Sequence, residues 1–190
     1  MKELIRAILG QKNVNKIKAF LRARKDSKKE KEDLKVRTAF YKQFVFSGDL
    51  CFDVGANVGN RIDPMLALGA KVVAVEPQES CYLHLQKKYG NRIELVTKGL
   101  GAEEGEQDFY IANASTVSSF STEWIDSVKE DRFKEYNWNK VVKTKITTLD
   151  KLIEEFGVPK FIKIDVEGYE LQVLKGLSTK CEYISIEYTV

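Results

Sequence analysis

The sequence has little of the residue types that build disulfide scaffolds and many metal centres. Its three cysteines, Cys51, Cys81 and Cys181, are widely spaced, and no two of them form a C-x-x-C pair. Disulfide bonds and cysteine-bound metals are therefore not expected, and a reducing, cytoplasmic setting is favoured. The single histidine, His84, has no clustered partner, so we expect it at the surface or in packing rather than in catalysis.

Long apolar runs are also missing. No uninterrupted apolar stretch is long enough to cross a bilayer, which argues against a transmembrane helix. The first ten residues carry Lys2, Glu3 and Arg6 among apolar positions, which argues against a cleavable signal. The length of 190 residues and an ordinary balance of apolar and charged residues predict one soluble domain with a sizeable core.

Charge is distributed unevenly along the chain. Residues 1–42 hold 14 Lys/Arg against 5 Asp/Glu, whereas the remainder holds 17 against 23. Apolar residues recur at helical spacing in this N-terminal part, so we expect a basic helical arm over 1–42 and a domain over 43–190. A solvated helix packed on the domain is favoured. Peripheral contact with an anionic membrane surface at the inner face is second, and nucleic acid is not favoured.

Strand-like and helix-like segments alternate through the first half of the domain. Apolar runs at 50–54, 71–75 and 93–96 are separated by helical patterns over 61–68 and 80–89. Repeated strand–helix units predict an α/β fold with a doubly wound, mostly parallel sheet. Further strands are expected at 108–112, 140–147, 161–164 and 183–187, with helices after Thr148 and from Tyr169 to Lys175.

A polar and aromatic insert, about 113–140, separates two of these strands. Long inserts on α/β sheets often form lids or substrate walls. The alternative, that Trp124 and Trp138 only pack the insert onto the domain, is equally favoured.

The turn after the first strand has the pattern Asp53-x-Gly55-x-x-x-Gly59. It lacks the third glycine of the dinucleotide pattern G-x-G-x-x-G, and its acid would repel a pyrophosphate. Glu76 ends the second strand 23 residues later, where an acid can accept hydrogen bonds from ribose hydroxyls. A ligand with a ribose, a cationic amino-acid end and no phosphate fits best, which predicts S-adenosylmethionine. A tight turn without a ligand is the alternative.

Acids also follow the two later strands. Asp165 and Glu167 come after the strand at 161–164, and Glu187 ends the strand at 183–187. Because an aliphatic hydroxyl must lose its proton to become a good nucleophile, such acids suit a general base or a metal site. Asp165 is the leading candidate, and Asp165 with Glu187 could hold Mg²⁺ or another divalent cation. For Glu167 and Glu170, the alternative is a solvated or helix-capping role.

Together these segments resemble the FkbM family of S-adenosylmethionine-dependent methyltransferases. The resemblance covers about residues 40–190 and rests on four regions that occur in the same order as in the family. They are Asp53-Val54-Gly55-Ala56-Asn57-Val58-Gly59, Val73-Ala74-Val75-Glu76-Pro77, Thr148-Leu149-Asp150 followed by Lys163-Ile164-Asp165-Val166-Glu167-Gly168 with Glu170, and Ile184-Ser185-Ile186-Glu187.

The resemblance implies a class I methyltransferase (Rossmann-like) fold and O-methylation of a hydroxyl on a sugar, glycan or natural product. It also implies the positions of three groups of residues. The methionine end of the cofactor would lie against Asp53, Gly55, Asn57 and Gly59; the ribose against Glu76; and the adenine beside a turn formed by Lys98, Gly99 and Leu100. Ala56 and Pro77 are further candidates for cofactor binding. Asp165, Glu167 and Glu187 would face the reaction centre.

One departure from the family pattern concerns the end of the sheet. The family continues beyond the strand that ends at Glu187 into a helix and two further strands, whereas this sequence reaches only Val190. We expect either a truncated form or an exposed fifth strand that pairs with a second copy of the chain. A non-catalytic S-adenosylmethionine-binding or scaffold module is therefore the alternative function. A nicotinamide-dependent oxidoreductase is disfavoured by the Asp-x-Gly turn.

Overall fold

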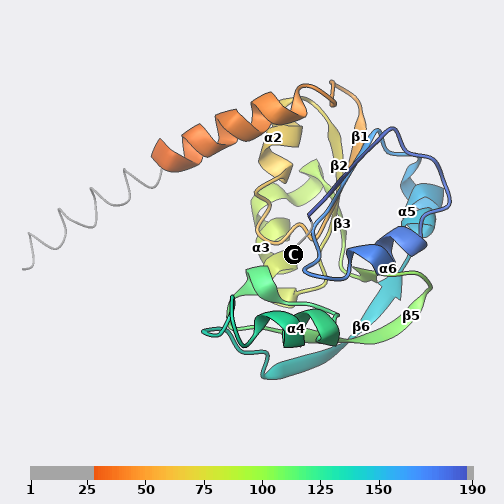
Figure 1. The fold of residues 1–190 in the computed structure, drawn as a ribbon. Helices are drawn as coiled ribbons and strands as arrows, with labels where there is room; N and C mark the ends of the chain where they lie inside the picture. Colours follow the sequence, from red (N-terminus) through yellow and green to blue (C-terminus); the bar gives the residue numbers. More distant parts are fainter. Residues whose placement is uncertain (1–27, 188–190) are drawn as a thin grey trace, which may run out of the picture.

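Five parallel strands form the central sheet of the computed structural model, which describes residues 28–187 (Figure 1). Their order across the sheet is β3 (Glu94–Val96), β2 (Lys71–Val75), β1 (Leu50–Val54), β7 (Phe161–Ile164) and β8 (Tyr183–Ile186). The chain builds outward from β1 in one direction and returns to its other side at β7, so the strand order reverses between β1 and β7. Ligands of open α/β sheets bind at such a reversal, outside the carboxyl ends of the strands.

Helices cover both faces of this sheet, as the predicted doubly wound fold requires (Figure 1). On one face lie α2 (Ile62–Ala67) and α3 (Glu79–Tyr89), and on the other α5 (Leu149–Phe156) and α6 (Glu170–Lys175). The α/β class and the parallel sheet are therefore confirmed.

Successive residues of β1 are buried in different cores. Cys51 packs in a cluster with Met65 of α2 and Leu85 of α3, whereas Phe52 packs in a second cluster with Leu149 of α5. All three consecutive residues Cys51, Phe52 and Asp53 are completely buried. Because side chains of a strand alternate between faces, a strand covered on both sides reads as a continuous apolar run. Asp53 interrupts that run and therefore needs a buried partner.

A second sheet of three strands extends the domain beyond the central one. Its order is β4 (Gly99–Leu100), β6 (Lys140–Thr147) and β5 (Gly105–Ile111), with β5 and β6 antiparallel. The prediction for β6 is confirmed, and β5 begins three residues before the predicted position. Gly99–Leu100 was predicted as a turn, but it forms a short strand because it pairs with Ile146 and Thr147 of β6.

The insert between β5 and β6 has its own small core. It contains η2 (Ser115–Val117) and α4 (Thr122–Val128), while the other short helix, η1 (Gly90–Arg92), follows α3. Trp124 is buried with Ile125 and Val128, and Trp138 packs at the edge of the same cluster. The indole N–H of Trp138 donates a hydrogen bond to the carbonyl of Val117 at 2.7 Å. The two tryptophans therefore pack the insert together, in agreement with the packing role predicted for them.

A helix over residues 28–41 precedes the sheet and ends in a turn. Tyr41 at its end is buried against Phe161 of β7, with ring centroids 5.4 Å apart. This end of the predicted basic arm therefore packs on the domain. Residues 1–27, on which the membrane-contact prediction mainly rests, lie outside the described residues. Between residues 28 and 187, no helix is long and apolar enough to cross a membrane.

Candidate functional site

A cavity of about 180 Å³ opens at the carboxyl ends of β1, β2 and β7, where the strand order reverses. The loops after these three strands form its floor. Part of its wall comes from the insert, through Ser115, Thr116, Ser118 and Phe120. The insert thus forms part of the cavity wall, which is one of the roles predicted for it. It also packs on itself.

Gly55 allows the loop after β1 to approach the loop after β7. Its φ is +75°, and a Cβ atom at this position would overlap the carbonyl oxygen of Asp165. Glycine adopts such a conformation without a steric penalty. Gly59 also has a positive φ, of +86°, and a side chain there would meet Tyr89. A Cβ there would lie 2.5 Å from the hydroxyl oxygen of Tyr89, which donates a hydrogen bond to the Gly59 carbonyl at 2.9 Å.

Glu76 is buried at the end of β2, yet it lines the cavity. One carboxylate oxygen accepts a hydrogen bond from the backbone N–H of Asn57 at 2.7 Å, and the other from that of Gln78 at 2.8 Å. Burial raises the pKa of Glu76 to about 7, although both hydrogen bonds act in the opposite direction. Since a carboxylate has about four acceptor positions, two remain for hydroxyl groups of a ligand.

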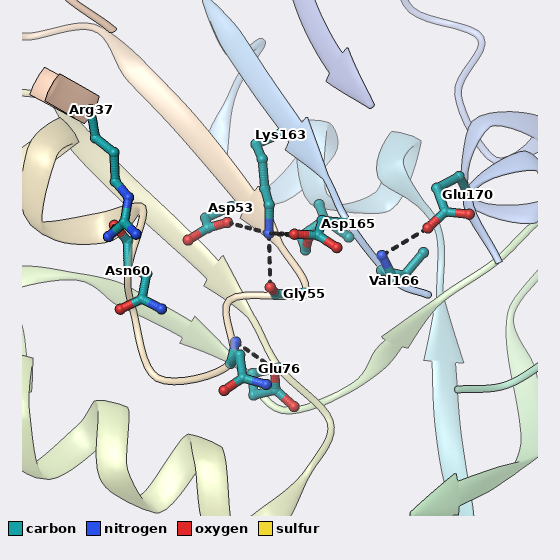
Figure 2. Close-up of polar contacts among 11 residues, drawn as sticks. Arg37, Asp53, Gly55, Asn60, Glu76, Lys163, Asp165, Val166 and Glu170 are labelled. Carbon is teal, nitrogen blue, oxygen red and sulfur yellow. Dashed lines mark hydrogen bonds and ion pairs between the residues drawn. The ribbon is translucent and has the colours of Figure 1, made fainter. Parts of the chain in front are cut away.

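Lys163 joins the loops after β1 and β7 (Figure 2). Its ammonium group lies 3.2 Å from Oδ1 of Asp53 and 3.3 Å from Oδ2 of Asp165, and it donates a hydrogen bond to the Gly55 carbonyl at 2.9 Å. Burial lowers the pKa of Lys163, but the charges of the two aspartates outweigh this effect and leave the pKa above its usual value. Lys163 is therefore a buried cation held between two acids.

Asp53 lies behind the cavity rather than in its wall. Its side chain is completely inaccessible to solvent, and the cavity lining does not include it. Burial raises the pKa of Asp53, with the charge of Lys163 opposing the shift. Neither carboxylate oxygen has a hydrogen-bond partner with good geometry among the described residues, so the ion pair with Lys163 is its main polar contact. Asp53 thus acts on the cavity through Lys163 in this arrangement.

Three carboxylates gather beyond Lys163. Asp165 and Glu167 line the cavity, while Glu187 lines an adjoining hollow that also contains Asp165. Burial, with the nearby charges of Asp165 and Glu187, raises the pKa of Glu167 to about 7. A hydrogen bond to Asp165 and its charge raise the pKa of Glu187. The predicted grouping of these three acids is therefore found in the structure.

Two non-glycine residues in the range 28–187 have a positive φ, and both line the cavity. They are Asn57, with φ of 47°, and Glu167, with φ of 54°. The Glu167 backbone is held by the hydroxyl of Ser119, which donates to its carbonyl at 2.5 Å. Such conformations cost free energy and cluster at functional sites. The strain therefore marks this cavity independently of the sequence motifs.

Most of the predicted cofactor residues come together here. Those that line the cavity are Gly55, Ala56, Asn57, Glu76, Pro77, Gly99 and Leu100. Gly59 packs against α3 instead, and Lys98 is exposed to solvent and lies outside the lining.

Three cationic residues that line the cavity were not predicted as site residues from the sequence. They are Lys163, Arg37 and Arg61. Lys163 had a detectable signal, since a lysine in the middle of the buried strand Phe161-Ile162-Lys163-Ile164 needs an anionic partner. The two arginines had none, because they come from the helix over 28–41 and from the residue before α2, where charged residues are common.

The residues present fit S-adenosylmethionine better than they fit a metal ion. Glu76 has free acceptor positions for a ribose, and the narrow turn at Gly55 leaves backbone exposed to a ligand. Within residues 28–187, no group of three or more His, Cys, Asp or Glu side chains is arranged to hold a metal ion. Metal binding by Asp165 and Glu187 remains a prediction.

The family to which the chain belongs follows from comparison with known proteins. A model of the methyltransferase FkbM domain matches residues 53–189, which begin within β1 and include every later strand and helix of the described chain. The chain belongs to the FkbM methyltransferase family. Members of this family are S-adenosylmethionine-dependent, which agrees with the free acceptor positions of Glu76 in the cavity.

Hexuronic acid methyltransferase AglP of Haloferax volcanii is a curated relative. It is 27% identical over 142 residues, which make up 72% of this chain and 53% of AglP. The chain therefore spans about half the length of this relative. A solved structure of a putative rRNA-methylase from Clostridium thermocellum is 23% identical, with a TM-score of 0.31, over 35% of this chain and 40% of that one. This partial likeness carries no conclusion about function.

Proposed function

We propose that this protein transfers a methyl group from S-adenosylmethionine to an oxygen atom of a sugar or glycan. The observation that carries the proposal is the position of Glu76 and Asp165 on two sides of one cavity at the reversal of strand order. Glu76 offers acceptors suited to a ribose, and Asp165 offers a carboxylate suited to an incoming nucleophile. Membership of the FkbM methyltransferase family supports the same chemistry.

The loops after β1 and β2 hold the cofactor in this proposal. Glu76 binds the ribose hydroxyls, Gly99 and Leu100 border the adenine, and Gly55, Ala56 and Asn57 lie along the methionine end. Asp53 supports this end indirectly, because Lys163 pairs with it and holds the Gly55 carbonyl. When bound, S-adenosylmethionine supplies a methyl group on a positively charged sulfur.

Asp165 is the proposed general base for a hydroxyl acceptor. As the hydroxyl oxygen forms its bond to the methyl carbon, the carboxylate of Asp165 takes up the hydroxyl proton, and the sulfur keeps the electron pair of the broken bond. Lys163, 3.3 Å from Asp165, holds this carboxylate in position. Glu167 and Glu187 surround the acceptor with further carboxylates, and a divalent cation held by Asp165 and Glu187 would lower the pKa of the hydroxyl in their place.

The relative AglP is named for a hexuronic acid. Hexuronic acids offer hydroxyls and also a carboxylate, and an ionised carboxylate attacks without losing a proton. We propose a hydroxyl acceptor as the lead and a hexuronate carboxylate as the second candidate. The two differ in their need for Asp165.

Calorimetry with S-adenosylhomocysteine and with NAD⁺ tests cofactor choice in the 190-residue chain. Binding of the former alone supports the proposal, whereas binding of NAD⁺ alone would overturn it. Transfer of isotope-labelled methyl groups to neutral and uronic-acid glycans then tests the activity. Binding of S-adenosylhomocysteine without transfer to any glycan would favour the non-catalytic module.

The variant Asp165→Asn distinguishes the two acceptor chemistries. We expect it to lower the rate of methyl transfer to a hydroxyl by about 10²- to 10⁴-fold, the usual contribution of a general base. Transfer to a carboxylate should fall much less. Asp126→Asn is the matched control, since Asp126 is an exposed acid of α4 paired with Lys129. A hydroxyl-methylating enzyme that is unaffected by Asp165→Asn would contradict the assignment of this base.

A further inference from the structure

We propose that Arg37 and Arg61 form a carboxylate-binding pair at the border of the cavity. The carboxylate has two sources within the proposed function, on which this inference rests: the methionine end of the cofactor and an acidic sugar acceptor. Both carry the same group, and the two sources can be separated by experiment.

The two arginines reach the same place from different elements. Arg37 belongs to the helix over residues 28–41, and Arg61 directly precedes α2. Both line the cavity and also the adjoining hollow between that helix and β8. Figure 2 shows Arg37 extending from its helix to the loop after β1, where it makes a long hydrogen bond of 3.4 Å to the carbonyl of Asn60.

Neither guanidinium group has an anionic partner within residues 28–187. None of the ion pairs in this range includes Arg37 or Arg61, although both side chains are half-buried. A partly desolvated cation is costly unless it is paired. Lys163, the third cation of the cavity, differs in this respect because Asp53 and Asp165 already neutralise it.

The nearest acids do not serve as partners for these arginines. Glu187 lines the adjoining hollow beside them, but it forms no ion pair with either one in the described part of the chain. The charges of Lys163 and Arg61 act to lower the pKa of Glu187, but the hydrogen bond to Asp165 and the charge of Asp165 outweigh them and raise it. Asp165 is engaged by Lys163. The position opposite Arg37 and Arg61 is therefore open to an anion brought by a ligand.

A carboxylate is the anion that fits this position. The planar guanidinium group presents parallel N–H donors that match the two oxygens of a carboxylate. The position borders Gly55, Ala56 and Asn57, where the methionine end of the cofactor is proposed to lie. It also borders Asp165, where the acceptor is proposed to enter. Either ligand can therefore place a carboxylate between the two arginines.

The test compares Arg37→Gln, Arg61→Gln and the double variant with the wild-type chain. Calorimetry measures binding of S-adenosylhomocysteine, of 5′-methylthioadenosine, which lacks the amino-acid end, and of glucuronate and glucose in the presence of 5′-methylthioadenosine. Arg92→Gln is the matched control, because Arg92 lies on η1 and outside the cavity lining. The variants Arg37→Lys and Arg61→Lys keep the positive charge and should retain part of the affinity that the glutamine variants lose.

If the cofactor is the source, the double variant binds S-adenosylhomocysteine about 10- to 100-fold more weakly and 5′-methylthioadenosine unchanged. If the acceptor is the source, the affinity for glucuronate falls by a similar factor while both nucleosides bind as before. Equal loss for both nucleosides would show damage to the fold and overturn the inference, as would affinities within twofold of the wild type for all carboxylate ligands.

Failure of the proposed function has a separate signature. A wild-type chain that binds neither nucleoside overturns the proposed methyl transfer, irrespective of the arginines. In that case, glucuronate binding is measured without a nucleoside, and it still tests whether Arg37 and Arg61 bind a carboxylate. Binding that depends on Arg37 and Arg61 supports the pair, and its absence in the wild type overturns it.

Discussion

Asp53 and Lys163 face each other across neighbouring strands, with Oδ1 and Nζ 3.2 Å apart in the interior of the protein. They are aligned in the register of β1 and β7, so the backbone pairing itself brings the two side chains together. Asp53 is completely buried, and Lys163 is 6% exposed. The ion pair therefore joins the ends of β1 and β7. The strand order reverses between these two strands, and the cavity opens there.

Removal of Lys163 should strongly destabilise the protein. The variant Lys163→Met leaves the charge of Asp53 buried without its partner, which typically costs about 3–5 kcal/mol in the free energy of unfolding. Urea unfolding followed by circular dichroism measures this loss. The double variant Asp53→Asn/Lys163→Met should recover much of it, because the completely buried charge of Asp53 is then removed together with its partner.

The pH dependence of this variant gives a second check. Burial raises the pKa of Asp53, and the loss of Lys163 removes the main opposing effect. An acid with a raised pKa in the folded state binds its proton more readily when folded, so acidification stabilises the fold at this site. The deficit of Lys163→Met relative to the wild type should therefore shrink as the pH falls from neutral. A deficit independent of pH would show that Asp53 is not the source.

Glu76→Gln should weaken cofactor binding. The glutamine amide would place an N–H group towards one of the backbone N–H groups of Asn57 and Gln78, which now bind the two carboxylate oxygens. We expect the affinity for S-adenosylhomocysteine to fall by about 10- to 100-fold, since hydrogen bonds to a charged group contribute about 1.5–3 kcal/mol. Calorimetry measures the change, and Glu79→Gln in the first turn of α3 is the control.

Cofactor affinity should also depend on pH through Glu76. Its pKa of about 7 means that the carboxylate takes up a proton as the pH falls through neutrality, and protonation removes acceptor capacity for the ribose. Binding of S-adenosylhomocysteine by the wild type should therefore weaken from pH 8 to pH 6. If Glu76→Gln shows the same slope over this range, another group is responsible.

The sequence predicted most of the frame of the fold and part of the site. The alternation of apolar runs and helix signals located β6 at Lys140–Thr147 and the helix α5, which begins after a Thr148 cap and ends before Gly157. Local patterns suffice there because each element has its own start and stop signals. The short strand β4 was missed, since two residues, Gly99 and Leu100, become a strand only through pairing with β6.

The role predicted for Asp53 in cofactor binding stays a prediction, but the position of its side chain could not be read from the sequence. The sequence placed this acid against the ligand, but its side chain lies outside the cavity lining and opposite Lys163. Which face of a strand borders a cavity depends on the register with β7, and no local pattern reports that register. The contribution of Arg37 depends equally on how the helix over 28–41 packs on the sheet.

Glu167 should control an inflection in the pH–rate profile of methyl transfer. Its pKa of about 7, raised by burial and by the charges of Asp165 and Glu187, changes the charge beside the proposed base near neutrality. The rate constant kcat/KM for a hydroxyl acceptor should rise with pH up to about 7 and then level off. In Glu167→Gln this inflection should disappear. A profile that keeps the inflection in the variant would assign it to a different group.

Gly55→Ala tests the close approach of the loops after β1 and β7. The alanine methyl group would overlap the carbonyl oxygen of Asp165, and a φ of +75° is itself unfavourable for alanine. Overpacking and backbone strain each cost about 1–3 kcal/mol, so the free energy of unfolding should fall by at least about 2 kcal/mol. Affinity for S-adenosylhomocysteine should fall as well, because the carbonyl of Gly55 would move away from Lys163.

Gly105→Ala is the matched control for this last variant. Gly105 begins β5, and a Cβ atom there would have no neighbour within 4 Å. Its substitution should change stability by less than about 0.5 kcal/mol, as is usual for surface positions without special contacts. Urea unfolding of the two variants side by side measures the difference. Equal stability of Gly55→Ala and Gly105→Ala would mean that the two loops can separate without cost, and that Gly55 does not set the shape of the cavity.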